Sequence, residues 1–144
     1  VEILIVVFII GLLSSIVLVG LGSFRARGRD ARRIADLHSV QNALELYFTK
    51  EGRYPDITAT DNSGWRNFAN TLVGAGIGVN VVPNDPGGAT KSYYYGDNDD
   101  GMSYVLKAKL EDSNSAVLRE DIDGNVYGLD CDDMSTESNY CIQF

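Results

Sequence analysis

The chain begins with an apolar run and continues with an amphipathic pattern. The 22 residues from Ile3 to Phe24 carry no charge. A helix of that length spans about 33 Å, which is enough to cross a bilayer. Glycine and serine residues interrupt the run, and small residues of this kind favour close packing between helices. We therefore expect residues 1–24 to be a transmembrane helix or a helix that packs against copies of itself.

Residues 25–52 show one apolar stripe at helical spacing. Its members are Ile34, Leu37, Val40, Leu44, Tyr47 and Phe48. Gly52 and Pro55 mark the end of the helix. The sequence therefore predicts one helix of about 50 residues, whose first half is apolar all round and whose second half is amphipathic. We expect its hydrogen bonding to be continuous from Asp30 to Lys50, with any break between Gly11 and Gly22.

Residues 53–144 have the pattern of a small domain with an antiparallel sheet. A short helix is expected near Trp65–Leu72. The strand pattern is clearest in residues 102–112, where Tyr104, Leu106, Ala108 and Leu110 share one face and Lys107, Lys109 and Glu111 the other. The pattern predicts strands at residues 116–120 and 125–130 around a turn at 121–124. It also predicts a last strand at residues 140–144. We expect a sheet over residues 93–144 with one solvent-exposed face and one buried face, which the apolar stripe of the helix covers. The predicted fold class is α+β.

The charges are distributed unevenly around a net charge of −8. Residues 1–53 contain seven Lys or Arg and five Asp or Glu, whereas residues 54–144 contain five and fifteen. The acidic second part argues against a nucleic-acid partner. The basic residues of the helix cluster at Arg25, Arg27, Arg29, Arg32 and Arg33. They suit a collar at lipid headgroups, or local pairs of Arg33 with Asp30 and of Arg32 with Asp36.

Two loops concentrate carboxylates. One contains Asp97, Asp99 and Asp100, and the other contains Asp121 and Asp123. Calcium binds six to eight oxygens, so these residues are candidate calcium ligands, although neither loop has EF-hand spacing. Asp and Asn also favour turns without any ion. No motif of a nucleophile, a phosphate loop or a catalytic metal appears, so we expect no enzyme activity and no other cofactor.

Two stretches resemble one protein family. The N-terminal "VEILIVVFIIGLLSSIVL" is similar to the start of type IV pilins and type II secretion pseudopilins, and "ALELYFTKEGRYP" is similar to the end of their long helix. The resemblance covers residues 1–55. Mature chains of the family usually begin Phe-Thr-Leu-Ile/Val-Glu, and Val1 and Glu2 match the last two positions. The resemblance thus implies three further residues before Val1, including the methylated N-terminal residue.

The resemblance implies a single-pass protein of the inner membrane that a leader peptidase processes and assembly machinery polymerises into a helical filament. Glu2 would pair with the N-terminal amine of a neighbouring subunit and so set the register of assembly. Without such a role, Glu2 is simply a carboxylate favoured by the helix dipole. For an exported domain, Cys131 and Cys141 are expected to form a disulfide. His38 lies far from both in sequence and is expected to face solvent.

The expected function is that of a structural subunit of an extracellular type IV pilus-like filament. A pseudopilin of a type II secretion system is the close alternative, because some pseudopilins hold calcium in a loop of this region. The cysteine pair favours the pilus, and the acidic loops favour the pseudopilin. An alternative of another class is a monomeric, membrane-tethered binding module.

Overall fold

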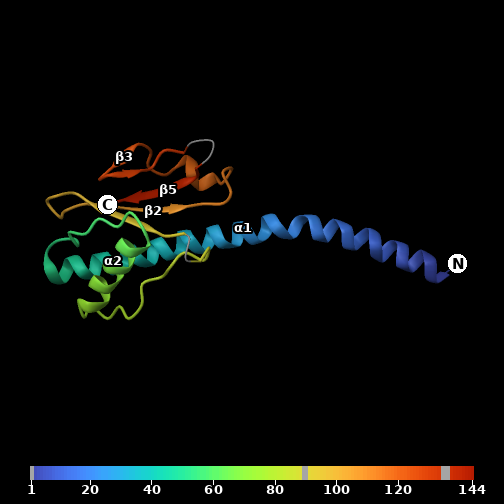
Figure 1. The fold of residues 1–144 in the computed structure, drawn as a ribbon, viewed down its shortest axis with the longest axis horizontal. Helices are drawn as coiled ribbons and strands as arrows, with labels where there is room; N and C mark the ends of the chain where they lie inside the picture. The colour runs from blue at the N-terminus through green and yellow to red at the C-terminus, as the bar shows by residue number, and fades with distance from the viewer. Residues whose placement is uncertain (1, 89–90, 134–136) are drawn as a thin grey trace.

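The protein combines one long helix with a small domain in an α+β arrangement, as predicted (Figure 1). The computed structural model describes residues 2–88, 91–133 and 137–144, and only the backbone of residues 17–21. The elements are α1 (Glu2–Glu51), α2 (Asn62–Gly74), β1 (Tyr94–Asp97), β2 (Tyr104–Lys109), the 3₁₀ helix η1 (Ala116–Arg119), β3 (Asn125–Val126), β4 (Leu129–Asp130) and β5 (Asn139–Gln143).

Helix α1 is unbroken from Glu2 to Glu51, so the expected continuity from Asp30 to Lys50 is confirmed and no break occurs between Gly11 and Gly22. The helix ends at Gly52, whose φ of 74° favours glycine and whose N–H donates to the Phe48 carbonyl at 2.8 Å. The N-terminal half of α1 extends beyond the domain (Figure 1). Only the second half can therefore contribute to the core of the subunit.

The core forms where the apolar stripe of α1 meets the sheet and α2. Leu37 and Leu44 are fully buried in the same cluster as Leu106 of β2 and Trp65 and Phe68 of α2. The expected cover of the sheet by the helix stripe is thereby confirmed. Asp61 caps the N-terminus of α2, and its side chain accepts a hydrogen bond from the Gly64 N–H at 2.7 Å. This cap helps to fix the position of α2 against α1.

The main sheet has three antiparallel strands in the order β1-β2-β5. In the register of β2 and β5, Lys107 lies opposite Cys141. The prediction of a solvent-exposed second face was wrong for Lys107, which is buried together with Val105. The β3–β4 hairpin and the cysteine pair cover this part of the face, and the Lys107 ammonium donates to the Asp130 carbonyl. Burial of this lysine depends on that partner, because an unpaired buried charge is costly.

The segment between β2 and β5 differs from the prediction in two ways. Residues 116–119 form η1 rather than a strand, with the Leu118 N–H donating to the Ser115 carbonyl at 3.3 Å. The hairpin turn lies at Tyr127 and Gly128 rather than at residues 121–124. Both turn residues have positive φ, 46° and 79°, which suits a two-residue type I′ turn. The strands β3 and β4 consequently form a separate small sheet.

Arg33 is fully buried and joins α1 to two distant segments. Its guanidinium contacts Asp30 at 2.6 Å, Asp85 at 2.8 Å and Glu111 at 2.9 Å. Asp30 also accepts hydrogen bonds from the backbone N–H groups of Glu111 and Asp112. Because the charges are paired and hydrogen-bonded, the cluster can remain ionised inside the protein. It fixes the angle between α1 and the loop that follows β2.

Three arginines of the basic cluster of α1 pair with carboxylates of the domain, whereas the expected lipid collar stays a prediction. Arg29 contacts Glu111 at 2.8 Å and Arg27 contacts Asp112 at 3.2 Å. The local pair of Arg33 with Asp30 is confirmed, and Arg32 lies 3.7 Å from Asp36. Cation clusters bind the nearest carboxylates, and the folded domain supplies these within reach of the helix.

Candidate functional site

The first candidate site is the exposed apolar surface of α1, which we define as residues 3–16. Eleven large apolar side chains of this segment are at least half exposed, from Ile3 at 78% to Ile16 at 65%. This part of α1 extends away from the domain (Figure 1). Exposed apolar patches of this extent mark interaction surfaces. The expectation that this segment is exposed in a single subunit is confirmed.

The expected membrane span, residues 3–24, includes residues 17–21, whose side chains lie outside the described part of the chain. Over the residues that the structure does describe, no helix combines the length and the apolar character needed to cross a membrane.

Glu2 lies in the first turn of α1, at the tip of the apolar surface. Its side chain is exposed, and it forms no ion pair with any described residue. A carboxylate in this place is favoured by the partial positive charge of the helix N-terminus. The described residues give it no ion-pair partner, and the role in assembly that the family resemblance implies stays a prediction.

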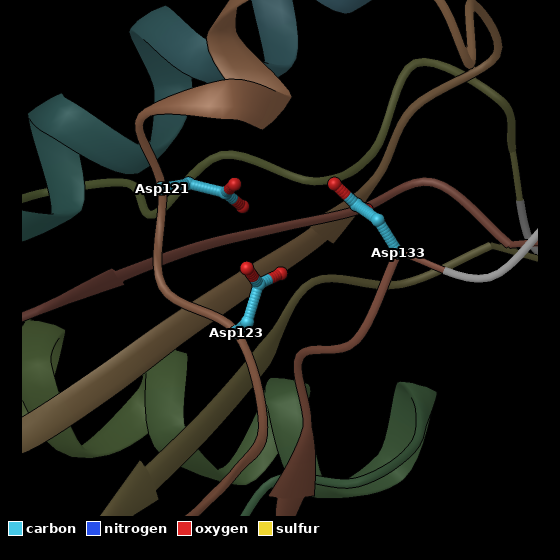
Figure 2. Close-up of side chains that lie close together, drawn as sticks. All are labelled: Asp121, Asp123 and Asp133. Carbon is cyan, nitrogen blue, oxygen red and sulfur yellow. The ribbon is translucent and has the colours of Figure 1, made fainter.

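The second candidate site is a cluster of three carboxylates, Asp121, Asp123 and Asp133 (Figure 2). Their nearest oxygens all lie within 4.8 Å of one another, and the side chains point toward a common space. Asp121 follows η1, Asp123 precedes β3, and Asp133 lies two residues after Cys131. The fold thus unites two predicted calcium candidates with a third residue that the prediction left out.

Hydrogen bonds hold the cluster in place. The Cys141 N–H donates to Asp121 Oδ2 at 2.9 Å, while the buried Oδ1 of Asp121 has no hydrogen-bond partner among the described residues. Burial, followed by the carboxylates of Asp133 and Asp123, raises the pKa of Asp121 to about 6. Burial also raises the pKa of Asp133. The three oxygens and the uncompensated negative charge fit calcium, whose remaining ligands would have to come from water or backbone carbonyls.

The other predicted calcium candidates lie elsewhere. Asp97 ends β1, and Asp99 and Asp100 lie in the loop between β1 and β2. Asp100 accepts a hydrogen bond from the Met102 N–H at 2.8 Å, as an Asp in a turn commonly does. Burial and the carboxylates of Asp56 and Asp99 raise the pKa of Asp97. Among the described residues, these three do not form a metal-binding group of the kind seen at Asp121.

The expected disulfide is confirmed. Cys131 and Cys141 are bonded, and their Cα atoms lie 5.8 Å apart. The bond ties the segment after β4 to β5, next to the buried side chains of Val105 and Leu129. The disulfide therefore positions Asp133 for the carboxylate cluster.

His38 is exposed on α1, as expected, and its Nδ1 lies 2.8 Å from the Gln41 side-chain oxygen.

Comparison of this chain with protein-family models, with curated proteins and with solved structures found no match. The function of the protein is therefore inferred from its geometry and from the resemblance in residues 1–55.

Proposed function

We propose that the protein is a structural subunit that polymerises into an extracellular type IV pilus-like filament through the apolar surface of α1. The single observation that carries the proposal is the exposure of residues 3–16 on a helix that continues into the folded domain. A helix that is apolar all round requires an apolar environment on every side. In a filament, copies of the same helix supply that environment.

The energetics favour assembly. Burying one large apolar side chain contributes about 1.5–3 kcal/mol. If about half of the eleven exposed side chains become buried, the gain is roughly 8–16 kcal/mol. Association costs an estimated 4–15 kcal/mol in lost freedom of motion and ordering. The apolar surface alone is therefore large enough to offset most or all of that cost, without contacts between the acidic domains.

Glu2 sets the register of the assembly in this proposal. A carboxylate carried into an apolar core is costly unless a positive group pairs with it, such as the N-terminal amine of a neighbouring subunit. A subunit in the wrong register would leave that charge unpaired. The proposed effect of Glu2 is therefore selectivity among registers rather than added affinity.

The experiment compares Glu2→Gln with wild type in a filament assembly assay, by sedimentation and negative-stain microscopy. The matched control is Glu51→Gln, which alters an exposed carboxylate at the other end of the same helix. We expect Glu2→Gln to fold normally, as judged by circular dichroism, and to lose ordered filaments, while Glu51→Gln assembles like wild type. Normal filaments from Glu2→Gln would contradict the proposed role of Glu2.

A pseudopilin of a type II secretion system is the second candidate, and the carboxylate cluster at Asp121 favours it. If calcium stabilises the domain through this cluster, short filaments should form only when calcium is present. Filament length with calcium and with a chelator distinguishes the two candidates. Long filaments in both conditions favour the pilus.

A further inference from the structure

A groove of about 530 Å³ runs between α2 and the segment around residues 80–85. Its floor is apolar, with the buried side chains of Trp65 and Val82. Val81, at 79% exposure, and Val73 stand at its margin. Four asparagines line the polar part of its wall. The groove thus offers apolar contacts together with hydrogen-bonding groups, as binding grooves commonly do.

The groove carries positive charge in an otherwise acidic domain. Residues 54–144 contain only five Lys or Arg. Two of these, Arg66 and Lys91, line the groove. The one carboxylate of the groove, Asp85, is neutralised by Arg33 at 2.8 Å. Arg66 forms no ion pair with any described residue, and Lys91 lies 3.9 Å from Glu111.

The loop between β1 and β2 has the complementary character. Asp99 and Asp100 are exposed and form no ion pair with any described residue, and Met102 beside them is 54% exposed. Arg53 lies near this loop but pairs with Asp56 at 3.2 Å. The loop therefore presents negative charge next to an exposed apolar side chain, which matches the cations and valines of the groove.

We propose that the groove between α2 and residues 80–85 binds the β1–β2 loop of a second copy of this chain, with Asp99 and Asp100 facing Arg66. This inference rests on the proposed filament and names a contact between its outer domains. The loop lies at the end of the domain farthest from the N-terminus, whereas α2 lies at the side of the domain (Figure 1). Two different surfaces that meet head to tail do not form a two-fold dimer; they produce an open filament when the rotation between copies does not close into a ring.

The two parts of the contact have different physical roles. The valines and Met102 supply apolar area, while the opposite charges determine which copy and which register are accepted. Like charges elsewhere on the two acidic domains repel, so a cationic groove is the place where an acidic loop is attracted. The interaction should weaken with salt, because exposed charges are screened.

The test is a charge exchange in the full chain, with the critical concentration for assembly as the readout. We expect Arg66→Glu and Asp99→Arg each to raise the critical concentration about tenfold, and the double variant to restore it to within about twofold of wild type. The matched controls are Arg119→Glu and Glu120→Arg, which change exposed charges next to η1. Arg119→Glu alone should leave assembly unchanged, and Glu120→Arg should not rescue Arg66→Glu.

The outcomes separate this inference from the proposed function. Rescue of Arg66→Glu by Asp99→Arg, without rescue by Glu120→Arg, supports the groove contact. Filaments that form normally in both single variants overturn the groove contact and leave the apolar assembly of α1 intact. Losses in both single variants without rescue in the double variant also overturn the pairing. If wild type forms no filaments at all, the proposed function itself fails.

Discussion

At Arg33, one guanidinium contacts three carboxylates inside the protein: Asp30 on the same helix, Asp85 before β1 and Glu111 after β2. A single side chain thereby connects segments more than fifty residues apart. Removing one member of such a cluster leaves the others buried without compensation, which costs more than the pairs contribute in net stability. The effect of residue-scale changes therefore depends on burial.

Replacing Arg33 by Met should destabilise the domain by about 3–5 kcal/mol, because three carboxylates then lose their common partner. The matched control is Arg32→Met, whose side chain is 65% exposed and lies 3.7 Å from Asp36. That change should cost less than about 1 kcal/mol. Urea unfolding followed by circular dichroism measures both, and equal losses in the two variants would contradict the stated role of burial.

The stability should depend on pH through Glu111. Hydrogen bonds from Arg29, followed by the contact with Arg33, lower the pKa of Glu111 from 4.5 to about 2. A carboxylate with a lowered folded pKa stabilises the fold above its unfolded pKa, and this contribution is lost as the pH falls from about 4.5 to 2. We therefore expect Glu111→Gln to be less stable than wild type at pH 7, with the difference vanishing toward pH 2.

Asp121 should show the opposite dependence when calcium is chelated. Its folded pKa of about 6 lies above the ordinary value of 3.8. The ionised form is therefore unfavourable in the fold above pH 6, and this penalty disappears as the pH falls toward 4. Unfolding curves of Asp121→Asn and of wild type between pH 4 and pH 8 measure this penalty. A difference in the free energy of unfolding between the two proteins that stays constant across that range would contradict the raised pKa.

Calcium should stabilise the wild type through the carboxylate cluster. Calcium in roughly 10–100-fold excess over its dissociation constant should add about 1.4–2.7 kcal/mol to the free energy of unfolding. Asp123→Asn removes one ligand and should abolish most of this gain. Asp99→Asn, in the other acidic loop, is the control and should keep it. Isothermal titration calorimetry and thermal unfolding provide the measurements, and equal responses of the two variants would exclude this cluster as the site.

At the scale of elements, the β3–β4 hairpin and the disulfide close one face of the sheet over Val105 and Lys107. Strands β3 and β4 of the hairpin pair with each other as a separate two-stranded sheet. Isolated two-stranded hairpins are at best marginally stable. Its position therefore depends on the bond between Cys131 and Cys141, which are ten residues apart.

Replacing both cysteines by serine should lower the free energy of unfolding by about 2–4 kcal/mol, because a short loop loses its closure. Lys107 should gain exposure at the same time, since its cover is loosened. Urea unfolding measures the first effect, and acetylation of Lys107 followed by mass spectrometry measures the second. Lys109, whose side chain is 40% exposed, serves as the internal control for reactivity. Unchanged stability of the serine variant would contradict this account.

At the scale of the whole molecule, α1 divides into two parts with different partners. The apolar stripe of residues 34–48 belongs to the core of the subunit, whereas the large apolar side chains of residues 3–16 are at least half exposed in the described part of the chain. Folding of the subunit and assembly of the proposed filament are therefore separable. The domain folds on its own core, and the exposed half of the helix is available to other copies.

A chain that begins at Arg25 should fold with nearly unchanged stability and lose self-association. The removed residues include the exposed apolar surface, so the free energy of unfolding should change by less than about 0.5 kcal/mol. Sedimentation velocity should show a monomer. A large loss of stability in the shortened chain would mean that the apolar segment packs on its own domain.

The sequence by itself predicted features that depend on local order. The apolar stripe from Ile34 to Phe48 and the stop at Gly52 define α1, because helical spacing and a positive φ are local properties. Alternation in residues 104–110 defined β2 and its core face for the same reason. The cysteine pair followed from the family resemblance, and the structure confirmed it.

Only the tertiary structure decided which distant groups meet. Asp133 joins Asp121 because the disulfide and η1 bring two loops together, and no spacing in the sequence records that approach. Lys107 alternates like a solvent-facing residue, but the hairpin that covers it comes more than fifteen residues later. Likewise, the helical spacing suggested Asp30 for Arg33 but could not suggest Asp85, 52 residues away. Local patterns determine conformation, whereas burial and charge pairing depend on contacts between elements that only the folded chain makes.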